Sequence, residues 1–351
     1  MNTMGGASPP ARRTFAVSAL AIVAAVGLGV AQAPQAQGEV RLLPVQGNVS
    51  MIVGAGANIT VQAGDDGILL VDTGLAALSE KVLDAIWPLS KKPLVYIINT
   101  SDQADHVGGN ENIGRTGRPV STVGQMRMLY RNDWLRRLKD RNAAADPAVS
   151  APGAYIIAFS TILERMSAPA GRAASAPEAA WPYDTYSEPQ KNLYFNGEAV
   201  QIFHQPGNTD GNSIVMFRRS DVISTGDLVD LTSYPVIDIE RGGSIQAVLE
   251  GLNRLKQMAV PAEYEEGGTL LITGHGRLAD RTDLAWYQQM VTIVRDRLQD
   301  MIGKGMTLDQ VKAARPTRDF DPIYGHTTGT WTTEMFIEAA YKSLSKQAGR
   351  R

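Results

Sequence analysis

The chain has 351 residues, a formal net charge of −2 and 44% apolar residues, a composition typical of globular proteins with a substantial core. Because the charge is nearly balanced and no extended block of like charges occurs, we expect no nucleic-acid partner. The sequence contains no cysteine, which excludes disulfides, thiolate metal ligands and a thiol nucleophile. Any catalysis must therefore rest on histidines, carboxylates, hydroxyls and bound ions.

Residues 1–33 have the order of an export signal. Arg12 and Arg13 precede an apolar run at 14–30, and small residues at 31–33 offer a cleavage site. We therefore predict a periplasmic or extracellular protein with no stable membrane anchor after cleavage. The arginine pair also resembles a twin-arginine signal, so both export routes stay open. A retained anchor is the alternative, although this run is short for a bilayer.

Residues 40–71 contain short alternating apolar runs broken by Gly and Asn, which predicts a β-meander ending at Asp72. Residues 75–88 have helical periodicity, and residues 93–100 form an apolar run typical of a buried strand. This strand leads directly into a polar loop with the sequence SDQADH. The loop is therefore presented from a rigid element, as functional loops commonly are.

The middle of the chain is less regular. We expect a strand near Val120 and an amphipathic helix at 124–139. Residues 142–182 are rich in Ala, Pro, Ser and Gly, which predicts an irregular insertion around one short helix at about 157–166. Such an insertion is a candidate cover for a binding cleft.

A second β-rich block occupies residues 193–227, with Asn196-Gly197 as a hairpin turn. A helix at 244–258, a strand at 269–276 and long helices from Asp283 onward follow. Strands, helix, strand and helices thus occur in the same order twice. This repetition favours two sheets packed face to face with helices outside. We predict a single domain at 39–347.

Polar clusters follow several of the predicted strands: Ser101–His106, Pro206–Gly211, Thr225–Asp227 and Thr273–Gly276. Their order and spacing, together with the earlier Asp72-Thr73-Gly74, resemble the metallo-β-lactamase-like hydrolase superfamily over nearly the whole chain after the signal. The resemblance implies an α/β fold, the αββα sandwich, with two packed mixed β-sheets and helices on both outer faces. It also implies one or two metal ions at the sheet edges.

The family's two metal positions can be carried over residue by residue. One position uses both histidines of H-x-H and a third from a P-x-H-T-D-G-type loop, which fall on Ser101, Gln103 and Asn208. The other uses an Asp-His pair, a bridging Asp and a late His, which fall on Asp105, His106, Asp227 and His275. The first position has lost every imidazole, and the second is complete.

A hydroxyl or a carboxamide is a poor zinc ligand, so these losses predict one divalent ion instead of two. Zinc is the default, with Fe²⁺ or Mn²⁺ as alternatives because a mixed nitrogen and oxygen set selects weakly. The alternative is a degenerate active site that binds no metal, in which the acids and imidazoles only form hydrogen bonds with one another.

Other polar residues have weaker claims. By resemblance, Asp72 braces the metal loops without binding metal. His204 lies on a predicted strand and His326 in a predicted surface loop, so we expect neither to be a ligand. Asp102 is a turn or capping residue, or a base close to the site.

The leading hypothesis is an exported one-metal hydrolase of a small-molecule ester, amide or lactone. Asp105 would hold the ion and orient water, while Gln103 and Asn208 would donate hydrogen bonds to the substrate oxygen. The alternative is a catalytically inactive binding or interaction protein with the same fold. Neither the substrate nor the oligomeric state is encoded in a readable motif.

Overall fold

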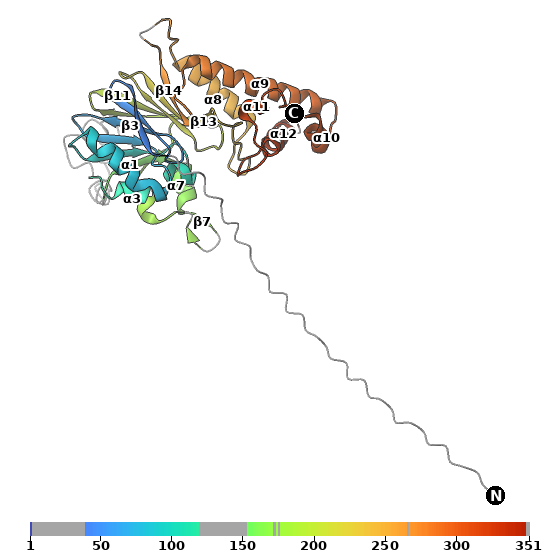
Figure 1. Ribbon diagram of the computed structural model, residues 1–351, viewed down its shortest axis with the longest axis horizontal. Coiled ribbons are helices and arrows are strands. Elements are labelled where there is room, and N and C mark those ends of the chain that lie inside the picture. The colour runs from blue at the N-terminus through green and yellow to red at the C-terminus, as the bar shows by residue number, and fades with distance from the viewer. Residues whose placement is uncertain (2–38, 119–152, 171–172, 175, 265–266, 349–351) are drawn as a thin grey trace, which may run out of the picture. The chain divides into compact units, whose positions relative to one another are not determined.

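Two β-sheets with helices on their outer faces make up the fold (Figure 1). The computed structural model describes Met1 and residues 39–118, 153–170, 173–174, 176–264 and 267–348. The predicted export signal, the strand near Val120 and the helix at 124–139 lie outside these ranges. Among the described residues, no helix is both long and apolar enough to cross a membrane.

The larger sheet has the strand order β1-β2-β3-β4-β5-β6-β9. Its strands are β1 (Arg41–Gln46), β2 (Val49–Val53), β3 (Ile59–Ala63), β4 (Ile68–Val71), β5 (Leu94–Ile98), β6 (Tyr155–Phe159) and β9 (Asp184–Tyr186). Neighbours from β1 to β4 pair antiparallel, which is the predicted meander, and those from β4 to β9 pair parallel. The parallel strands end at the same edge.

The smaller sheet has the order β10-β11-β12-β13-β14. Its strands are β10 (Gln190–Phe195), β11 (Glu198–His204), β12 (Ser213–Phe217), β13 (Val222–Asp230) and β14 (Leu270–His275). All pairs are antiparallel except β13 with β14. Asn196 and Gly197 have positive φ values of 50° and 77°, as the two-residue hairpin turn predicted for them requires.

Helices and short turns connect the strands. Before β9 they are η1 (Ala76–Leu78), α1 (Ser79–Ile86), η2 (Trp87–Leu89), α2 (Ala104–Val107), α3 (Asn110–Gly114), α7 (Ser160–Ser167) and η3 (Glu178–Ala180). After β13 they are α8 (Ile245–Met258), α9 (Arg281–Gly303), α10 (Leu308–Ala314), α11 (Asp321–Tyr324) and α12 (Thr333–Ala348). A short pair of strands, β7 (Pro169–Ala170) and β8 (Ala173–Ala174), follows α7.

Three apolar layers show how these elements pack. Val71 and Ile98 of the larger sheet share a buried cluster with Ile202 and Ile272 of the smaller sheet, so the two sheets pack face to face. Residues of α1 cover the outer face of the larger sheet. Residues of α8, α9 and α12 cover the outer face of the smaller sheet. This arrangement confirms the predicted αββα sandwich.

The segment predicted as an irregular insertion at 142–182 is partly regular. Its described part contains β6, which is buried along its length between β5 and β9, and α7, which begins only at Ser160. The apolar run of β6 is short, and short apolar runs fit a buried strand and a buried helix equally well. The helix predicted at about 157–166 therefore begins three residues later, at Ser160, because residues 157–159 are the end of β6.

Candidate metal centre

The site is built where β4 and β5 end side by side. Asp72 follows β4 and has a left-handed backbone with φ of 64°, which is unusual for a residue other than glycine. Its side chain holds the loop after β5, because Oδ1 accepts from Thr100 N at 2.8 Å and Oδ2 from Thr100 Oγ1 at 2.6 Å. These bonds stabilise the strained turn and fix the start of the SDQADH loop.

His106 lies on α2 with no exposed surface and contacts a carboxylate at each ring nitrogen. Nδ1 lies 2.8 Å from Asp72 Oδ2, and Nε2 lies 2.8 Å from Asp227 Oδ1. Burial disfavours the imidazolium, but the charges of Asp227 and Asp72 outweigh it and raise the pKa of His106 well above its usual range. His106 therefore links the loop of one sheet to a strand of the other.

Asp227 enters the site from β13 at a bend in the strand. Gly226 has φ of 51°, and a Cβ there would lie 2.7 Å from Oγ1 of Thr100, so only glycine fits. Oδ2 of Asp227 accepts a 2.8 Å hydrogen bond from Nε2 of Gln103. Burial opposes ionisation of Asp227, but His106 and His275 outweigh it and hold the pKa of this carboxyl well below its usual range.

His275 ends β14 and faces both remaining acids. Its Nε2 lies 3.2 Å from Asp105 Oδ2 and 3.5 Å from Asp227 Oδ1. Burial would lower the pKa of His275, but its hydrogen bonds with the two carboxylates raise that pKa to about 10. For Asp105, burial is outweighed by His275 and His106, which lower the pKa of its carboxyl. His275 and these two carboxylates thus form one hydrogen-bonded network with His106.

The donor set fits one divalent ion. Ligand atoms of Asp105, His106 and His275 all lie within 4.8 Å of one another, and Asp227 contacts both imidazoles. Tetrahedral ligand bonds of about 2.0–2.2 Å to zinc place neighbouring donors about 3.3–3.6 Å apart. The contacts of 2.8 Å, 3.2 Å and 3.5 Å in this group lie at or near that spacing, and the upper limit of 4.8 Å lies above it. Two imidazoles and two carboxylates are also donors that zinc accepts. The structure thus brings together the residues assigned to the complete position.

The residues assigned to the other position behave differently from one another. Ser101 is fully buried, and its Oγ accepts from Gln103 N at 3.2 Å. Gln103 is bonded to Asp227, as described above. Asn208 is 1% exposed, yet neither of its side-chain amide atoms has a hydrogen-bond partner among the described residues. A buried carboxamide of this kind indicates a partner outside the described residues, such as water or substrate.

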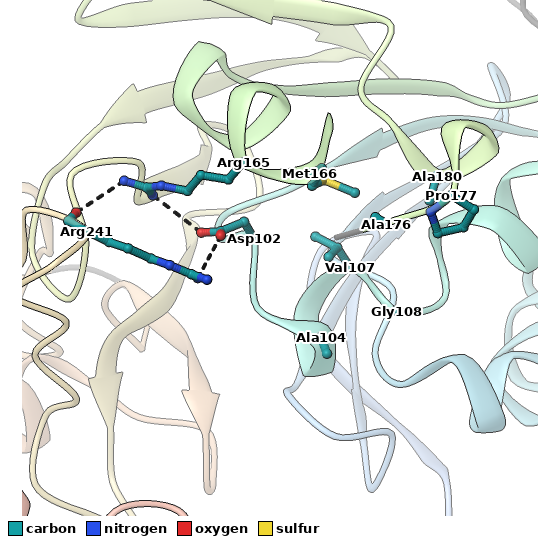
Figure 2. A pocket seen from close by; sticks show the side chains of 10 residues that line it. All are labelled: Asp102, Ala104, Val107, Gly108, Arg165, Met166, Ala176, Pro177, Ala180 and Arg241. Atoms are coloured by element: carbon teal, nitrogen blue, oxygen red, sulfur yellow. Dashed lines mark hydrogen bonds and ion pairs between the residues drawn. The ribbon is translucent and has the colours of Figure 1, made fainter. Parts of the chain in front are cut away.

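Asp102 has a role that the sequence did not indicate. Its carboxylate is 4% exposed and accepts from Arg241 Nη1 at 2.8 Å and from Arg165 Nη1 at 3.4 Å (Figure 2). Arg165 also pairs with Asp210. Both oxygens of this carboxylate accept from guanidiniums, so the structure does not support the suggestion that Asp102 acts as a base. No local sequence signal reveals partners so far along the chain.

A pocket of about 190 Å³ opens beside this ion-pair cluster (Figure 2). Asp102, Arg165 and Arg241 form its polar side. Its apolar side is formed by Ala104, Val107, Met166, Ala176, Pro177 and Ala180. Ala104 and Val107 belong to α2, the helix that carries two of the candidate ligands. The pocket therefore adjoins the helix of the candidate metal centre, and the segment after β6 supplies its far wall.

The two remaining histidines lie outside the ligand group. His204 stacks on Phe159 with ring centroids 3.5 Å apart, and its Nε2 lies 2.6 Å from the carbonyl oxygen of Asp210. His326 is exposed in a loop, with Nε2 3.0 Å from the carbonyl oxygen of Thr232. Both match the structural roles expected for them.

The family model of the metallo-beta-lactamase superfamily matches residues 52–285, and the chain therefore belongs to this superfamily. No curated protein sequence matches the chain.

Among solved structures, the stereoselective inverting sec-alkylsulfatase Pisa1 from Pseudomonas sp. is 17% identical with a TM-score of 0.57, covering 86% of this chain and 50% of its own. A double mutant of that enzyme gives 16% identity and a TM-score of 0.61 with the same coverage. A metallo-beta-lactamase from Pontibacter korlensis is 14% identical with a TM-score of 0.48, covering 72% and 99%. At these identities the likeness concerns the fold alone. The chain spans about half the length of the alkylsulfatase chains.

Proposed function

We propose that the chain is an exported hydrolase that uses one divalent ion, held by Asp105, His106, Asp227 and His275, on a small-molecule ester, amide or lactone. The observation that carries the proposal is the convergence of two imidazoles with two carboxylates at the edge where strands of both sheets end. In α/β proteins, this edge is where ligands generally bind.

The four side chains divide into a buried and an accessible pair. His106 and Asp227 are 0% and 7% exposed, whereas His275 and Asp105 are 29% and 30% exposed. Substrate and water therefore approach from the side of Asp105 and His275. The ion, when bound, would polarise a carbonyl or lower the pKa of water. Zinc is the first candidate, with Fe²⁺ and Mn²⁺ as alternatives.

The chain's own groups supply the remaining steps. Asp72 fixes the ring of His106 through Nδ1, which leaves Nε2 for the ion. Asp105 holds the ion and orients the attacking water, because it is the accessible carboxylate of the set. Asn208, whose amide is buried without a partner in the described structure, donates to the oxygen that gains negative charge.

The pocket beside α2 supports a substrate with a compact apolar group. Its wall after β6 comes from α7 and the residues following it, the part of the chain predicted to cover the cleft. Sequence variation in this segment would alter specificity while leaving the ligands in place. This separation of binding wall and metal ligands is common in enzymes that share a scaffold.

The proposal is tested by metal analysis of protein purified without chelators and without a metal-binding tag. About one ion per chain is expected, given the count of suitable ligands. Turnover would be measured on a panel of esters, lactones and amides, with a secondary alkyl sulfate added because Pisa1 is a sec-alkylsulfatase. Cell fractionation with and without residues 1–33 tests export.

An inactive binding protein is the second candidate, and one observation favours it. His106 satisfies both of its nitrogens with carboxylates and thus completes a hydrogen-bond network without any ion. Protein free of metal, with no turnover on any panel member after addition of Zn²⁺, Fe²⁺ or Mn²⁺, would establish this candidate and exclude the hydrolase.

A further inference from the structure

We infer that Gln103 is a positioning residue for the metal ligand Asp227, and that its neutral amide keeps the centre at one ion. The inference rests on the proposed function, because it concerns how the same site holds its ion. It starts from one contact: Nε2 of Gln103 donates to Oδ2 of Asp227 at 2.8 Å, across 124 positions of sequence.

The backbone of Gln103 is a fixed base for this contact. Its carbonyl oxygen accepts from His106 N at 2.9 Å and from Val107 N at 3.0 Å, so Gln103 is the N-cap residue of α2. Its own N–H donates to Ser101 Oγ at 3.2 Å. With both backbone groups bonded, the side chain is presented from a rigid turn.

Asp227 needs such a partner because its carboxylate has two oxygens with different surroundings. Oδ1 faces the imidazoles of His106 and His275, at 2.8 Å and 3.5 Å. Oδ2 is turned to Gln103, and the whole side chain is only 7% exposed. Without Gln103, this buried oxygen would lose its described side-chain partner, and the carboxylate would be held through Oδ1 alone. Groups that orient a metal ligand in this way commonly change metal affinity about 10–100-fold.

The amide also acts against a second ion. A donor hydrogen on Nε2 occupies the side of Oδ2 that a cation would need, and a neutral amide adds no negative charge to attract one. Gln103 thus stabilises Asp227 as the ligand of a single ion. A charged or ligating side chain at this position would remove that restriction.

The test compares Gln103→Met and Gln103→Glu with the wild-type chain. Met has nearly the same length but no donor, and Glu has the same shape but opposes Asp227 with a second negative charge. Gln190→Met serves as the control, because Gln190 is exposed on β10 and its side chain donates to Asn192 Oδ1 at 2.6 Å. Zinc affinity is measured by competition with a chromophoric chelator, and ligand geometry by the visible spectrum of the Co²⁺ form.

We expect Gln103→Met to bind zinc about 10–100-fold more weakly, with an altered Co²⁺ spectrum. Its ion-free melting temperature should also fall, because Oδ2 of Asp227 stays buried without its donor, and a cooperative melting transition shows that the variant is folded. For Gln103→Glu we expect the same loss, because its carboxylate repels that of Asp227 instead of donating to it. Unchanged zinc affinity in Gln103→Met, or wild-type affinity at one ion in Gln103→Glu, overturns it. Equal losses in Gln103→Met and in the control also overturn it.

The outcome is distinguishable from failure of the proposed function. If the wild-type chain binds zinc and hydrolyses a substrate, but Gln103→Met has unchanged affinity, only the role of Gln103 is lost. If the wild-type chain binds none of the three ions, the hydrolase proposal and the role of Gln103 fall together.

Discussion

Glu198 and Gln62 join the two sheets through a 2.7 Å hydrogen bond between Oε1 and Nε2, deep inside the sandwich. Glu198 is 3% exposed and also accepts from Ser220 N, Ser220 Oγ and Arg219 N, at 2.8–2.9 Å. We expect Glu198→Ala to lower the free energy of unfolding by about 3 kcal/mol or more, because several buried donors lose their acceptor. Urea denaturation would measure this, with exposed Glu80→Ala as the control. A loss below about 1 kcal/mol would contradict the prediction.

Removing a ligand should separate metal content from folding. We expect His275→Ala and Asp105→Ala each to lose the ion and the stabilisation that it confers, which is about 2.7 kcal/mol at a free ion concentration 100 times Kd. Melting curves with and without chelator would show a shift for the wild-type chain and none for either variant. His326→Ala, in an exposed loop, should behave like wild type. A wild-type melting curve that changes with neither chelator nor added zinc would support the alternative of a hydrogen-bonded network that binds no ion.

Restoring the lost imidazoles should rebuild the second position. We expect the triple variant Ser101→His, Gln103→His and Asn208→His to bind about two ions per chain in place of about one, because three protein ligands suffice for a catalytic zinc. The changes at Ser101 and Asn208 alone should add no ion. Elemental analysis of the folded variants would measure the number of ions per chain. A triple variant that still carries one ion would show that the loops have moved along with their ligands.

Filling the pocket should change specificity without changing metal binding. Met166 forms part of its apolar wall, and Met166→Trp should raise KM about tenfold or more for substrates with a bulky apolar group, while small substrates are affected less. Met335→Trp introduces the same side chain at a position 44% exposed on α12 and is the control for the substitution itself. The comparison uses KM across a series of esters of increasing size. Equal effects on small and bulky substrates would argue against this pocket as the substrate site.

The ion pairs of Glu338 with Lys312 and Lys342, the first of which joins α12 to α10, should weaken at low pH. Lys312 and Lys342 lie 2.8 Å and 2.6 Å from Glu338, and they hold the pKa of its carboxyl at about 2, below the usual 4.5. Because the folded pKa is lowered, Glu338 stabilises the protein above about pH 4.5, and the effect is lost as pH falls towards 2. Glu338→Gln should therefore cost at most about 1 kcal/mol at pH 7, since the pair is exposed, and nothing near pH 2. Denaturation midpoints over this range would test it.

Much of the framework could be predicted because it is encoded locally. Alternating apolar residues predicted β1–β4, and Asn196-Gly197 predicted its hairpin, since both signals depend on neighbours in sequence. The strand β6 could not be identified in the same way, because its short apolar run carries no period that distinguishes strand from helix.

The candidate ligands were found by a different route. Asp105, His106, Asp227 and His275 stand in motifs whose order resembles a known superfamily, and the structure places them together. Their partners were not predictable. Gln103 donates a hydrogen bond to Asp227, and Asp102 accepts from Arg165 and Arg241. These contacts join segments far apart in the sequence, so which side chains meet depends on how the two sheets pack.

The burial of His106 bears on how such a protein can change over evolutionary time. Loss of this imidazole would leave the carboxylates of Asp72 and Asp227 buried with one partner fewer, and breaking a buried charged pair typically costs about 3–5 kcal/mol. A descendant that had abandoned chemistry would therefore still be under selection to keep His106 for folding. The presence of His106 is therefore weak evidence that a protein of this fold is catalytically active. Asp105 and His275, each about 30% exposed, are less essential to the core, and their joint survival is the more informative trace of an ion.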